Sequence, residues 1–265
     1  MPDDGGYLLG NLEPEAPSRL QALSSLFDAW TFAHLDRLGI GEGWRCWEVG
    51  AGSASVPGFL AARAGASGYV LATDLEPTML PGGAGFEVRR HELGRDPVPE
   101  GGFDLVHARL VLVHVAERDR ALADLVSSLR PGGLLLVEEA DPALQPLVCP
   151  DERGDEERLA NRLKDGFRQL MAARGVDLAF GRTLPRRLRA AGLEDVESDA
   201  YFPITSPACR VLELATVAQI RGRLVSAGLA TAEEIDRHLD HVREGRLDLA
   251  TSPLVSAWGR RGGRA

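Results

Sequence analysis

The segment EVGAGSAS, residues 48–55, joins an acidic side chain to a glycine-rich turn. Gly50 and Gly52 let the backbone turn sharply after an apolar stretch and leave amide groups exposed at the start of a helix. Such a turn can bind a carboxylate or a phosphate group of a ligand. The dinucleotide-binding fingerprint GxGxxG needs a third glycine at position 55, which is Ser55 here. The turn alone therefore does not predict a dinucleotide.

Asp74 closes the next apolar stretch, 22 residues after Gly52. At that spacing its carboxylate can accept two hydrogen bonds from a ribose diol, although it could instead cap the segment LEPTML that follows. Glu92 ends the third stretch, where it could accept a hydrogen bond from an exocyclic amine or remain a solvated loop acid. The glycine turn and the acid at position 74 together predict a ligand that contains adenosine.

The composition narrows the kind of partner. A formal charge of −9 does not attract nucleic acid or an anionic membrane, so we expect neither, but a small neutral or cationic ligand.

Cys46, Cys149 and Cys209 lie far apart with no CxxC or Cys/His pairing, which predicts no metal site and a reducing, cytoplasmic location. The acidic N-terminus and the shortness of every apolar run, compared with the about 20 residues of a membrane span, predict no signal peptide or span. Abundant Ala, Gly and Arg are typical of a bacterial chain from a high-GC genome.

Apolar strand patterns alternate with helical patterns in the first half of the chain. Residues 18–38 place apolar and aromatic side chains on one helical face, which predicts an amphipathic lead-in helix that ends at Gly39. LRPGG, residues 129–133, is predicted to be a connection, because Pro131 stops a helix and glycines favour a turn. Strands separated by helices imply a parallel sheet covered on both faces. The expected strands are 45–49, 69–74, 87–93, 103–108 and 134–140, with helices from the glycine turn to Ala64 and over 117–129.

Beyond Asp141 the alternation loosens and helical patterns dominate. Thr231 and Glu234 have the spacing of a capping box, which predicts the start of a helix. Residues 205–248 are predicted to be a helical insertion rather than a separate domain. The other expected elements are a helix with Leu159, Leu163, Phe167 and Leu170 on one face, a helix near 183–191, and strands 196–204 and 254–259.

Four segments in register extend this interpretation: EVGAGSA, ATDLEP, HEL followed by PVPEGGFDLVHARLVLVHV, and LRPGGLLLVEEADP. Over residues 44–142 their order and spacing resemble the successive motifs of class I S-adenosylmethionine-dependent methyltransferases. The resemblance implies an α/β, Rossmann-like, seven-stranded and mostly parallel sheet, with helices on both faces and the last strand antiparallel. It also implies that S-adenosyl-L-methionine lies across the carboxyl ends of the first strands.

The resemblance also implies which positions bind this cofactor. Ala54 stands where many members keep glycine and requires a right-handed backbone there, and Glu92 stands where aspartate is commoner. By position, the methionine portion would meet Glu48, Gly50, Ala51, Gly52 and Ser53, the ribose Asp74, the adenine Leu75, Glu92 and Leu93, and the amino end the backbone around Ala108 and Arg109.

The resemblance divides the chain into an N-terminal helical lid, residues 1–40, and a methyltransferase domain, residues 41–265. Tyr7 lies outside the helical pattern and is the first candidate for a lid ring that faces the sulfonium, whereas Phe27 and Trp30 have the spacing of core residues. The insertion is predicted either to cap the acceptor pocket or to form a homodimer contact.

Methyl transfer is an in-line displacement that depends mainly on alignment and exclusion of water. For a hydroxyl nucleophile, His114 is the first candidate for a general base, the alternative being a structural histidine, and His107 inside a strand is the second. Arg109 is predicted to hold a carboxylate or to pair with an acid such as Glu139. Asp141 ends the fifth strand and is more readily explained as a turn residue.

Three functions follow from these patterns. The first is S-adenosylmethionine-dependent methyl transfer to a small apolar or aromatic metabolite. The second is a nicotinamide-dependent oxidoreductase, which Asp74 favours but Ser55 opposes, as does the lack of a Tyr-x-x-x-Lys pair in a chain whose only lysine is Lys164. The third is a protein of the same fold that binds S-adenosylmethionine and catalyses a non-methylating reaction such as a cyclisation.

Overall fold

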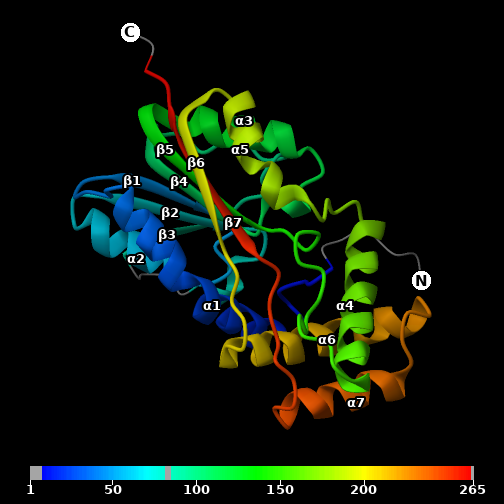
Figure 1. Cartoon of the computed structure of the whole chain (residues 1–265). Helices are drawn as coiled ribbons and strands as arrows, with labels where there is room; N and C mark the ends of the chain where they lie inside the picture. Colours follow the sequence, from blue (N-terminus) through cyan, green and yellow to red (C-terminus); the bar gives the residue numbers. More distant parts are fainter. Residues whose placement is uncertain (1–7, 81–84, 264–265) are drawn as a thin grey trace. The chain divides into compact units, whose positions relative to one another are not determined.

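The chain forms two compact units in the computed structural model, which describes residues 8–80 and 85–263. We name them the sheet unit and the helical unit (Figure 1). Helix α1, Ala16–Arg37, contributes residues 16–26 to the helical unit and its remainder to the sheet unit. The sheet unit takes its described residues from 27–140, 180–201 and 254–265, and the helical unit from 1–26, 141–179 and 202–253.

Within the described residues, the sheet unit contains one sheet of seven strands. The strands are β1 (Arg45–Val49), β2 (Tyr69–Asp74), β3 (Glu87–Arg90), β4 (Phe103–Arg109), β5 (Leu129–Ala140), β6 (Leu193–Tyr201) and β7 (Leu254–Arg261). Their order is β3-β2-β1-β4-β5-β7-β6. The pairs from β3 to β5 are parallel, whereas β7 is antiparallel to both of its neighbours. The predicted mostly parallel sheet with an antiparallel last strand is confirmed.

Helices cover the faces of this sheet (Figure 1). They are α2 (Ser55–Ala64), α3 (Arg118–Ser128) and α5 (Phe180–Ala190), with the short turns η1 (Pro77–Met79) and η2 (Leu112–His114). Because alternate strand residues share a face, Cys46, Leu105 and Leu136 of three neighbouring strands form one core. Leu35 of α1 and Leu60 of α2 complete it. Each such buried leucine stabilises the fold by roughly 1.5–3 kcal/mol.

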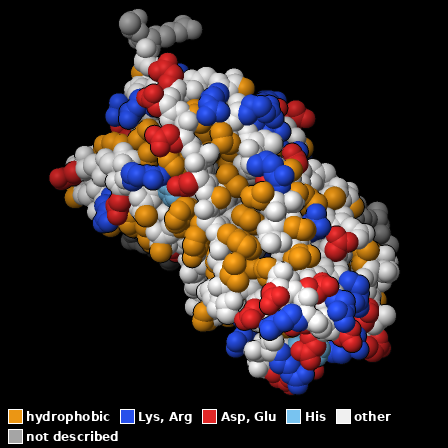
Figure 2. Space-filling view, viewed as in Figure 1, with side chains coloured by type: hydrophobic (Ala, Val, Ile, Leu, Met, Phe, Trp, Pro, Cys, Tyr) orange, Lys and Arg blue, Asp and Glu red, His pale blue; other side chains and the backbone are white. Residues whose placement is uncertain are grey.

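The helical unit packs three further helices around its own apolar core. They are α4 (Asp155–Ala173), α6 (Pro207–Ser226) and α7 (Ala232–Arg243). Leu163, Ile220 and Ile235 bring one buried side chain from each helix into this core. The predicted capping box is confirmed: Glu234 N–H donates to Thr231 Oγ1 at 3.2 Å, and Thr231 N–H donates to Glu234 Oε2 at 3.0 Å. Figure 2 shows basic and acidic side chains intermixed over α7.

Strand β5 begins earlier than the sequence predicts. LRPGG, residues 129–133, was predicted to be a connection, and that prediction is wrong because β5 starts at Leu129. Leu129 pairs with Phe103, and the register then shifts before Leu134 pairs with Leu105. Pro131 is tolerated in this irregular part, since a proline cannot donate a hydrogen bond to a regular ladder.

Strand β3 ends three residues before its predicted limit at Leu93. His91 N–H still donates to Asp74 O at 3.0 Å, but Glu92 N–H donates to the carboxylate of Asp96 at 2.7 Å. The local hydrogen bond that Glu92 N–H donates to Asp96 replaces the ladder, so the chain leaves the sheet here.

Strand β6 is displaced toward the N-terminus, because it covers Leu193–Tyr201 rather than residues 196–204. Its pairing with β7 shifts between Glu194 and Glu197, and Asp195 in that shift has a φ of 51°. This bulge adds a residue that no periodic pattern anticipates.

The helices of the predicted insertion, residues 205–248, lie in the helical unit together with residues 141–179. The lid candidate Tyr7 lies outside the described residues. Among the helices that the structure describes, none combines the length and the apolar character needed to cross a membrane.

Candidate functional site

The glycine turn follows β1 and is tied to the end of β2. Gly50 and Gly52 have φ values of 64° and 59°, a left-handed backbone that glycine adopts without strain. Ala51 N–H donates to Thr73 O at 2.9 Å. Gly52 N–H donates to Asp74 Oδ2 at the same distance. The structure therefore brings the turn and the acid that the sequence singled out into direct contact.

Asp74 is nearly buried at the carboxyl end of β2, with 6% of its surface exposed. Its second oxygen, Oδ1, accepts from Glu76 N–H at 2.9 Å. Both carboxylate oxygens thus fix backbone amides, which leaves further lone pairs for a ligand hydroxyl. The ribose-binding role of Asp74 remains a prediction.

The departure from glycine at position 54 is accommodated. Ala54 has φ −81° and ψ −2°, the right-handed backbone that the sequence required there. Ser53 Oγ lies 3.0 Å from Ser55 Oγ at the start of α2. An alanine and two serines can therefore follow the glycine turn without strain.

The predicted adenine-binding residues differ in exposure. Leu75 is 45% exposed directly after β2, whereas Leu93 is buried. Glu92 Oε1 pairs with Arg95 Nη1 at 2.6 Å, so its carboxylate already has a cationic partner on the same loop. Their contact with an adenine remains a prediction.

A buried polar row, which we define as Glu48, His107 and Glu138, crosses β1, β4 and β5. All three side chains are at most 2% exposed. His107 Nδ1 lies 2.6 Å from Glu48 Oε2, and His107 Nε2 lies 3.3 Å from Glu138 Oε2. The pairing of Glu48 with His107 across β1 and β4 places the row near the carboxyl ends of these strands. His107 is therefore held by both ring nitrogens and is not free to serve as a general base.

The row continues into helix α1. Thr31 Oγ1 donates to Glu138 Oε2 at 2.5 Å, and Ser256 Oγ donates to Glu138 Oε1 at 2.7 Å. Arg109 donates to Thr31 Oγ1 at 2.9 Å and to Asp28 Oδ1 at 2.7 Å. The acid that pairs with Arg109 is thus Asp28, and the suggested pairing with Glu139 is wrong.

The charges of the row stabilise one another. Burial lowers the pKa of His107, but Glu48 and Glu138 outweigh burial and raise that pKa to about 9. Burial raises the pKa of Glu138, but His107 and Arg109 lower it to about 2. For Glu48 burial dominates and its pKa is raised, despite the opposing charge of His107. At neutral pH, His107 is an imidazolium beside an ionised Glu138.

The two oxygens of Glu48 differ in their contacts. Glu48 Oε2 is bound to His107, while Glu48 Oε1 has no hydrogen-bond partner among the described residues. An ammonium group is a donor of the kind that this carboxylate oxygen lacks. The residues present therefore fit the amino-acid end of S-adenosylmethionine. Among the described residues, no group of three or more His, Cys, Asp or Glu side chains could hold a metal ion.

The loop after β4 is held by a second buried acid, Glu139. Its Oε1 accepts from the N–H groups of Val111 and Leu112, at 3.0 and 2.7 Å. Burial raises the pKa of Glu139 to about 8, although these backbone donors oppose the rise. Leu110 in the same loop has a φ of 60°, an uncommon conformation for leucine that often marks functional sites. His114 ends this loop as an exposed side chain, and its role as a base remains a prediction.

Asp141 behaves as the sequence predicted for a turn residue. It belongs to the helical unit, and its Oδ1 accepts from Leu144 N–H at 2.8 Å. The sequence analysis did not anticipate Thr31, Glu138 or Ser256 as partners in a polar network. The sequence pattern that could have predicted this network is a polar residue inside each of three apolar strands, namely Glu48, His107 and Glu138.

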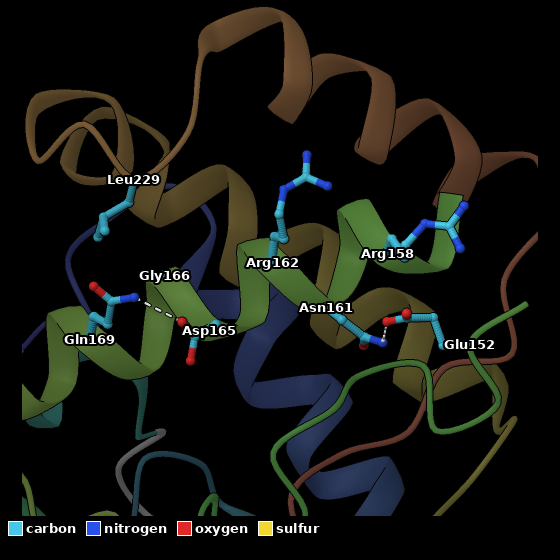
Figure 3. Close-up of a pocket in the computed structure, with 8 residues that line it drawn as sticks. All are labelled: Glu152, Arg158, Asn161, Arg162, Asp165, Gly166, Gln169 and Leu229. Carbon is cyan, nitrogen blue, oxygen red and sulfur yellow. Dashed lines mark hydrogen bonds between the residues drawn. The ribbon is translucent and has the colours of Figure 1, made fainter. Parts of the chain in front are cut away.

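A groove lies along α4 in the helical unit (Figure 3). Asn161 donates to Glu152 at 2.9 Å, and Gln169 donates to Asp165 at 2.8 Å. Arg162 donates to Glu234 at 2.9 Å. The polar groups of the groove thus bind one another, which is typical of a solvated helix surface. The groove is lined by Glu152, Arg158, Asn161, Arg162, Asp165, Gly166, Gln169 and Leu229.

Comparison with known proteins bears on the sheet unit. Residues 47–137 match the model of a family described as a methyltransferase domain. The ubiquinone/menaquinone biosynthesis C-methyltransferase UbiE of Bordetella avium (strain 197N) is 30% identical over 133 residues, 47% of this chain and 52% of that protein. The chain thus spans about half the length of this curated relative. An uncharacterised 37.1 kDa protein in transposon Tn4556 of Streptomyces fradiae is 27% identical and covers 94% of this chain and 73% of its own length.

The fold is also found among solved structures. The phosphoethanolamine N-methyltransferase 2 of Haemonchus contortus in complex with S-adenosyl-L-methionine superimposes with a TM-score of 0.57 and 14% identity. The match covers 99% of this chain and 62% of that chain, and at this identity it shows the fold alone. The residues matched by the family model include the glycine turn, Asp74, and Glu48 and His107 of the polar row. With the strand order of the sheet, this match agrees with the resemblance of residues 44–142 to class I S-adenosylmethionine-dependent methyltransferases.

Proposed function

We propose that the chain binds S-adenosyl-L-methionine and transfers its methyl group to a small-molecule acceptor by direct in-line displacement. The observation that carries the proposal is the hydrogen bond between Gly52 and Asp74, together with a Glu48 oxygen that has no hydrogen-bond partner among the described residues. A turn and two acids in this arrangement suit a nucleoside with a cationic amino-acid tail.

The bound cofactor would supply an electrophilic methyl group on a positively charged sulfur. The protein's share of the chemistry is to bind and orient. Asp74 accepts hydrogen bonds from the ribose, the glycine turn lies against the methionine portion, and Glu48 accepts from the ammonium. Alignment of this kind accounts for most of the rate in a displacement reaction.

The acceptor is proposed to be a small apolar or aromatic metabolite. Support comes from the names of the Bordetella relatives, which are C-methyltransferases of quinone biosynthesis. The formal charge of −9 disfavours nucleic acid as the acceptor. Whether the predicted insertion contributes to the acceptor pocket or to a homodimer contact remains a prediction.

Calorimetric titration with S-adenosylhomocysteine and with NADH tests the cofactor. We expect binding of S-adenosylhomocysteine and none of NADH, and the reverse result would favour an oxidoreductase. Asp74→Ala is expected to weaken S-adenosylhomocysteine binding by roughly 1–3 kcal/mol, because ribose hydroxyls lose their acceptor. Unchanged affinity in a folded variant would remove Asp74 from the site.

Incubation of candidate acceptors with methyl-labelled S-adenosylmethionine tests the transfer itself. Label is expected in the product, whereas a product without label would favour a non-methylating reaction such as a cyclisation. His114→Ala is expected to slow turnover on a hydroxyl acceptor by about 10²-fold or more while the affinity for S-adenosylhomocysteine is kept. Wild-type turnover would show that alignment alone suffices.

A further inference from the structure

The two carboxylates of the polar row differ in the number of hydrogen bonds that they accept. Glu138 accepts hydrogen bonds from Thr31, Ser256 and His107, so both of its oxygens are bound. Glu48 has His107 as its single side-chain partner, through Oε2, and its Oε1 is left over. His107 is thus the residue that fixes the orientation of Glu48.

The acidic and basic groups around the row are also unequal in number. The described groups around the row are Glu48, Glu138 and Asp28 on the acidic side and His107 and Arg109 on the basic side. When all three acids are ionised, three carboxylates face two cations, so the acids exceed the cations by one. A further cation at Glu48 would balance the charges of the row.

Helix α1 adds one more titratable group that faces the row. His34 Nδ1 lies 3.9 Å from Glu138 Oε1, and His34 Nε2 is bound to Asp199 of β6 at 2.9 Å. His34 therefore contacts the Glu138 end of the row, and its own carboxylate partner is Asp199. At the Glu48 end, His107 is the one cationic side chain within hydrogen-bond distance among the residues that the structure describes.

We propose, building on the proposed function, that His107 is a positioning residue for the cofactor, which as an imidazolium holds Glu48 so that Oε1 accepts a hydrogen bond from the cofactor's α-ammonium group. The bound ammonium is then the third cation of the row. No covalent bond changes in this step.

This arrangement links cofactor binding to protons. Burial raises the pKa of Glu48, so the carboxyl retains a proton to higher pH in the free protein than an exposed glutamate does. The ammonium binds the ionised form, and any proton on Glu48 leaves to solvent when the cofactor binds. Affinity for a ligand with the ammonium therefore rises with pH through the pKa of Glu48.

His107→Gln separates this role from simple structural support. The variant keeps a hydrogen-bonding side chain but loses the cation, so we expect about tenfold to hundredfold weaker binding of S-adenosylhomocysteine near neutral pH. The pKa of Glu48 should rise further, so part of the lost affinity should return at higher pH. Binding of 5′-methylthioadenosine, which has no amino-acid tail, should change less than threefold.

His238→Gln is the matched control, because His238 forms a buried pair with Glu213 at 2.8 Å in the helical unit. It should leave both dissociation constants and their pH profiles unchanged. If His107→Gln does not fold, Glu48→Gln tests the same contact, with the same selective loss expected for S-adenosylhomocysteine.

The outcomes distinguish this inference from the proposed function. If wild-type protein binds neither S-adenosylhomocysteine nor 5′-methylthioadenosine, the proposed function fails. Should wild-type protein bind both while His107→Gln weakens them equally, or leaves the pH profile of S-adenosylhomocysteine binding unshifted, His107 is only structural and the inference is overturned.

Discussion

Each unit of the molecule buries a histidine against a glutamate, but the surroundings of the two pairs differ. His107 in the sheet unit is bound at both ring nitrogens, to Glu48 and to Glu138. His238 in the helical unit is bound at Nε2 to Glu213, and its buried Nδ1 has no partner. The exposed fraction of both histidines is 0%.

The difference shows what each pair does. The His238 pair joins α7 to α6 with one hydrogen bond, which is sufficient to connect two helices. The sheet unit instead supplies several donors and a guanidinium to the acids around the polar row, and Glu48 Oε1 is the one carboxylate oxygen of the row that has no partner among the described residues. Burying that many charges costs stability unless they are all paired, which is why we propose a cationic ligand group at the remaining oxygen of Glu48.

Removing an acid from each unit should show this difference most strongly. Glu138→Leu takes away the acceptor for Thr31 and Ser256 and one carboxylate of His107. We expect a loss of about 3–5 kcal/mol in the free energy of unfolding, as for a broken buried ion pair. Glu213→Leu removes one acceptor and should cost about 1–3 kcal/mol. Urea denaturation followed by circular dichroism measures both.

The reverse ranking would contradict the comparison. If Glu213→Leu cost more than Glu138→Leu, the helical pair would be the more tightly integrated of the two. His91→Gln serves as a control for loss of a buried histidine of the sheet unit, since its ring contacts Pro97 O and lies outside the row.

Glycines of the sheet unit offer the second test. Gly50→Ala places a methyl group where it would overlap Cγ2 of Val111, in a backbone with a φ of 64°. We expect a loss of roughly 2–3 kcal/mol, of which the left-handed backbone alone contributes 1–2. Gly58→Ala in α2 meets no atom within 4 Å and should stabilise by about 0.5–1 kcal/mol. Thermal unfolding of both variants tests whether the loss of stability is specific to the glycine turn or occurs at a helical glycine as well.

Much of the sheet unit could be predicted from the sequence, because its strands are short apolar runs between glycines. β1 and β2 have the predicted bounds, and the order of elements is as expected. The three largest displacements of strand ends lie where a local feature overrides periodicity. At Glu92 a carboxylate replaces the ladder, at Asp195 a bulge adds a residue, and at Pro131 a strand continues through a proline.

The candidate site was predictable only in part. The turn and Asp74 are neighbours along one βαβ unit, so spacing was sufficient to pair them. The polar row and its partners join residues 31, 48, 107, 138 and 256, and sequence spacing does not show which side chains from such distant segments meet. Glu139 was considered a partner for Arg109, but its carboxylate binds the backbone amides of the following loop.

A third test uses the opposite pKa directions of two buried acids. The pKa of Glu139 is raised from 4.5 to about 8, so its contribution to stability is complete below pH 4.5 and is lost as the pH rises toward 8. Glu139→Gln keeps the acceptor for the loop amides and removes the titration. The free energy of unfolding of the variant, relative to that of wild type, should increase steadily between pH 5 and pH 8. Above pH 8 this difference should stay constant.

Glu213→Gln should show the opposite sign. Burial raises the pKa of Glu213, but the hydrogen bond and charge of His238 outweigh burial and lower it below 4.5. Its contribution is therefore present above pH 4.5 and is lost as the pH falls through the lowered pKa. Denaturation of wild type and both variants from pH 3 to pH 9 measures the two profiles. Parallel profiles for the two variants would show that neither pKa is shifted as described.

The smallest effect is expected from glycines inside the helical unit. A Cβ at Gly166 of α4 would lie 2.9 Å from Leu224 Cδ2 and 3.4 Å from Leu229 Cβ, whereas a Cβ at Gly222 of α6 meets no atom within 4 Å. Gly166→Ala gains helix propensity but strains this packing, so we expect a net loss of up to about 1 kcal/mol. Gly222→Ala should gain about 0.5–1 kcal/mol from propensity alone. Because leucine side chains can rotate where a strained glycine turn cannot relax, Gly166→Ala should destabilise less than Gly50→Ala. Equal losses in thermal unfolding would show that the helical core is as constrained as the turn.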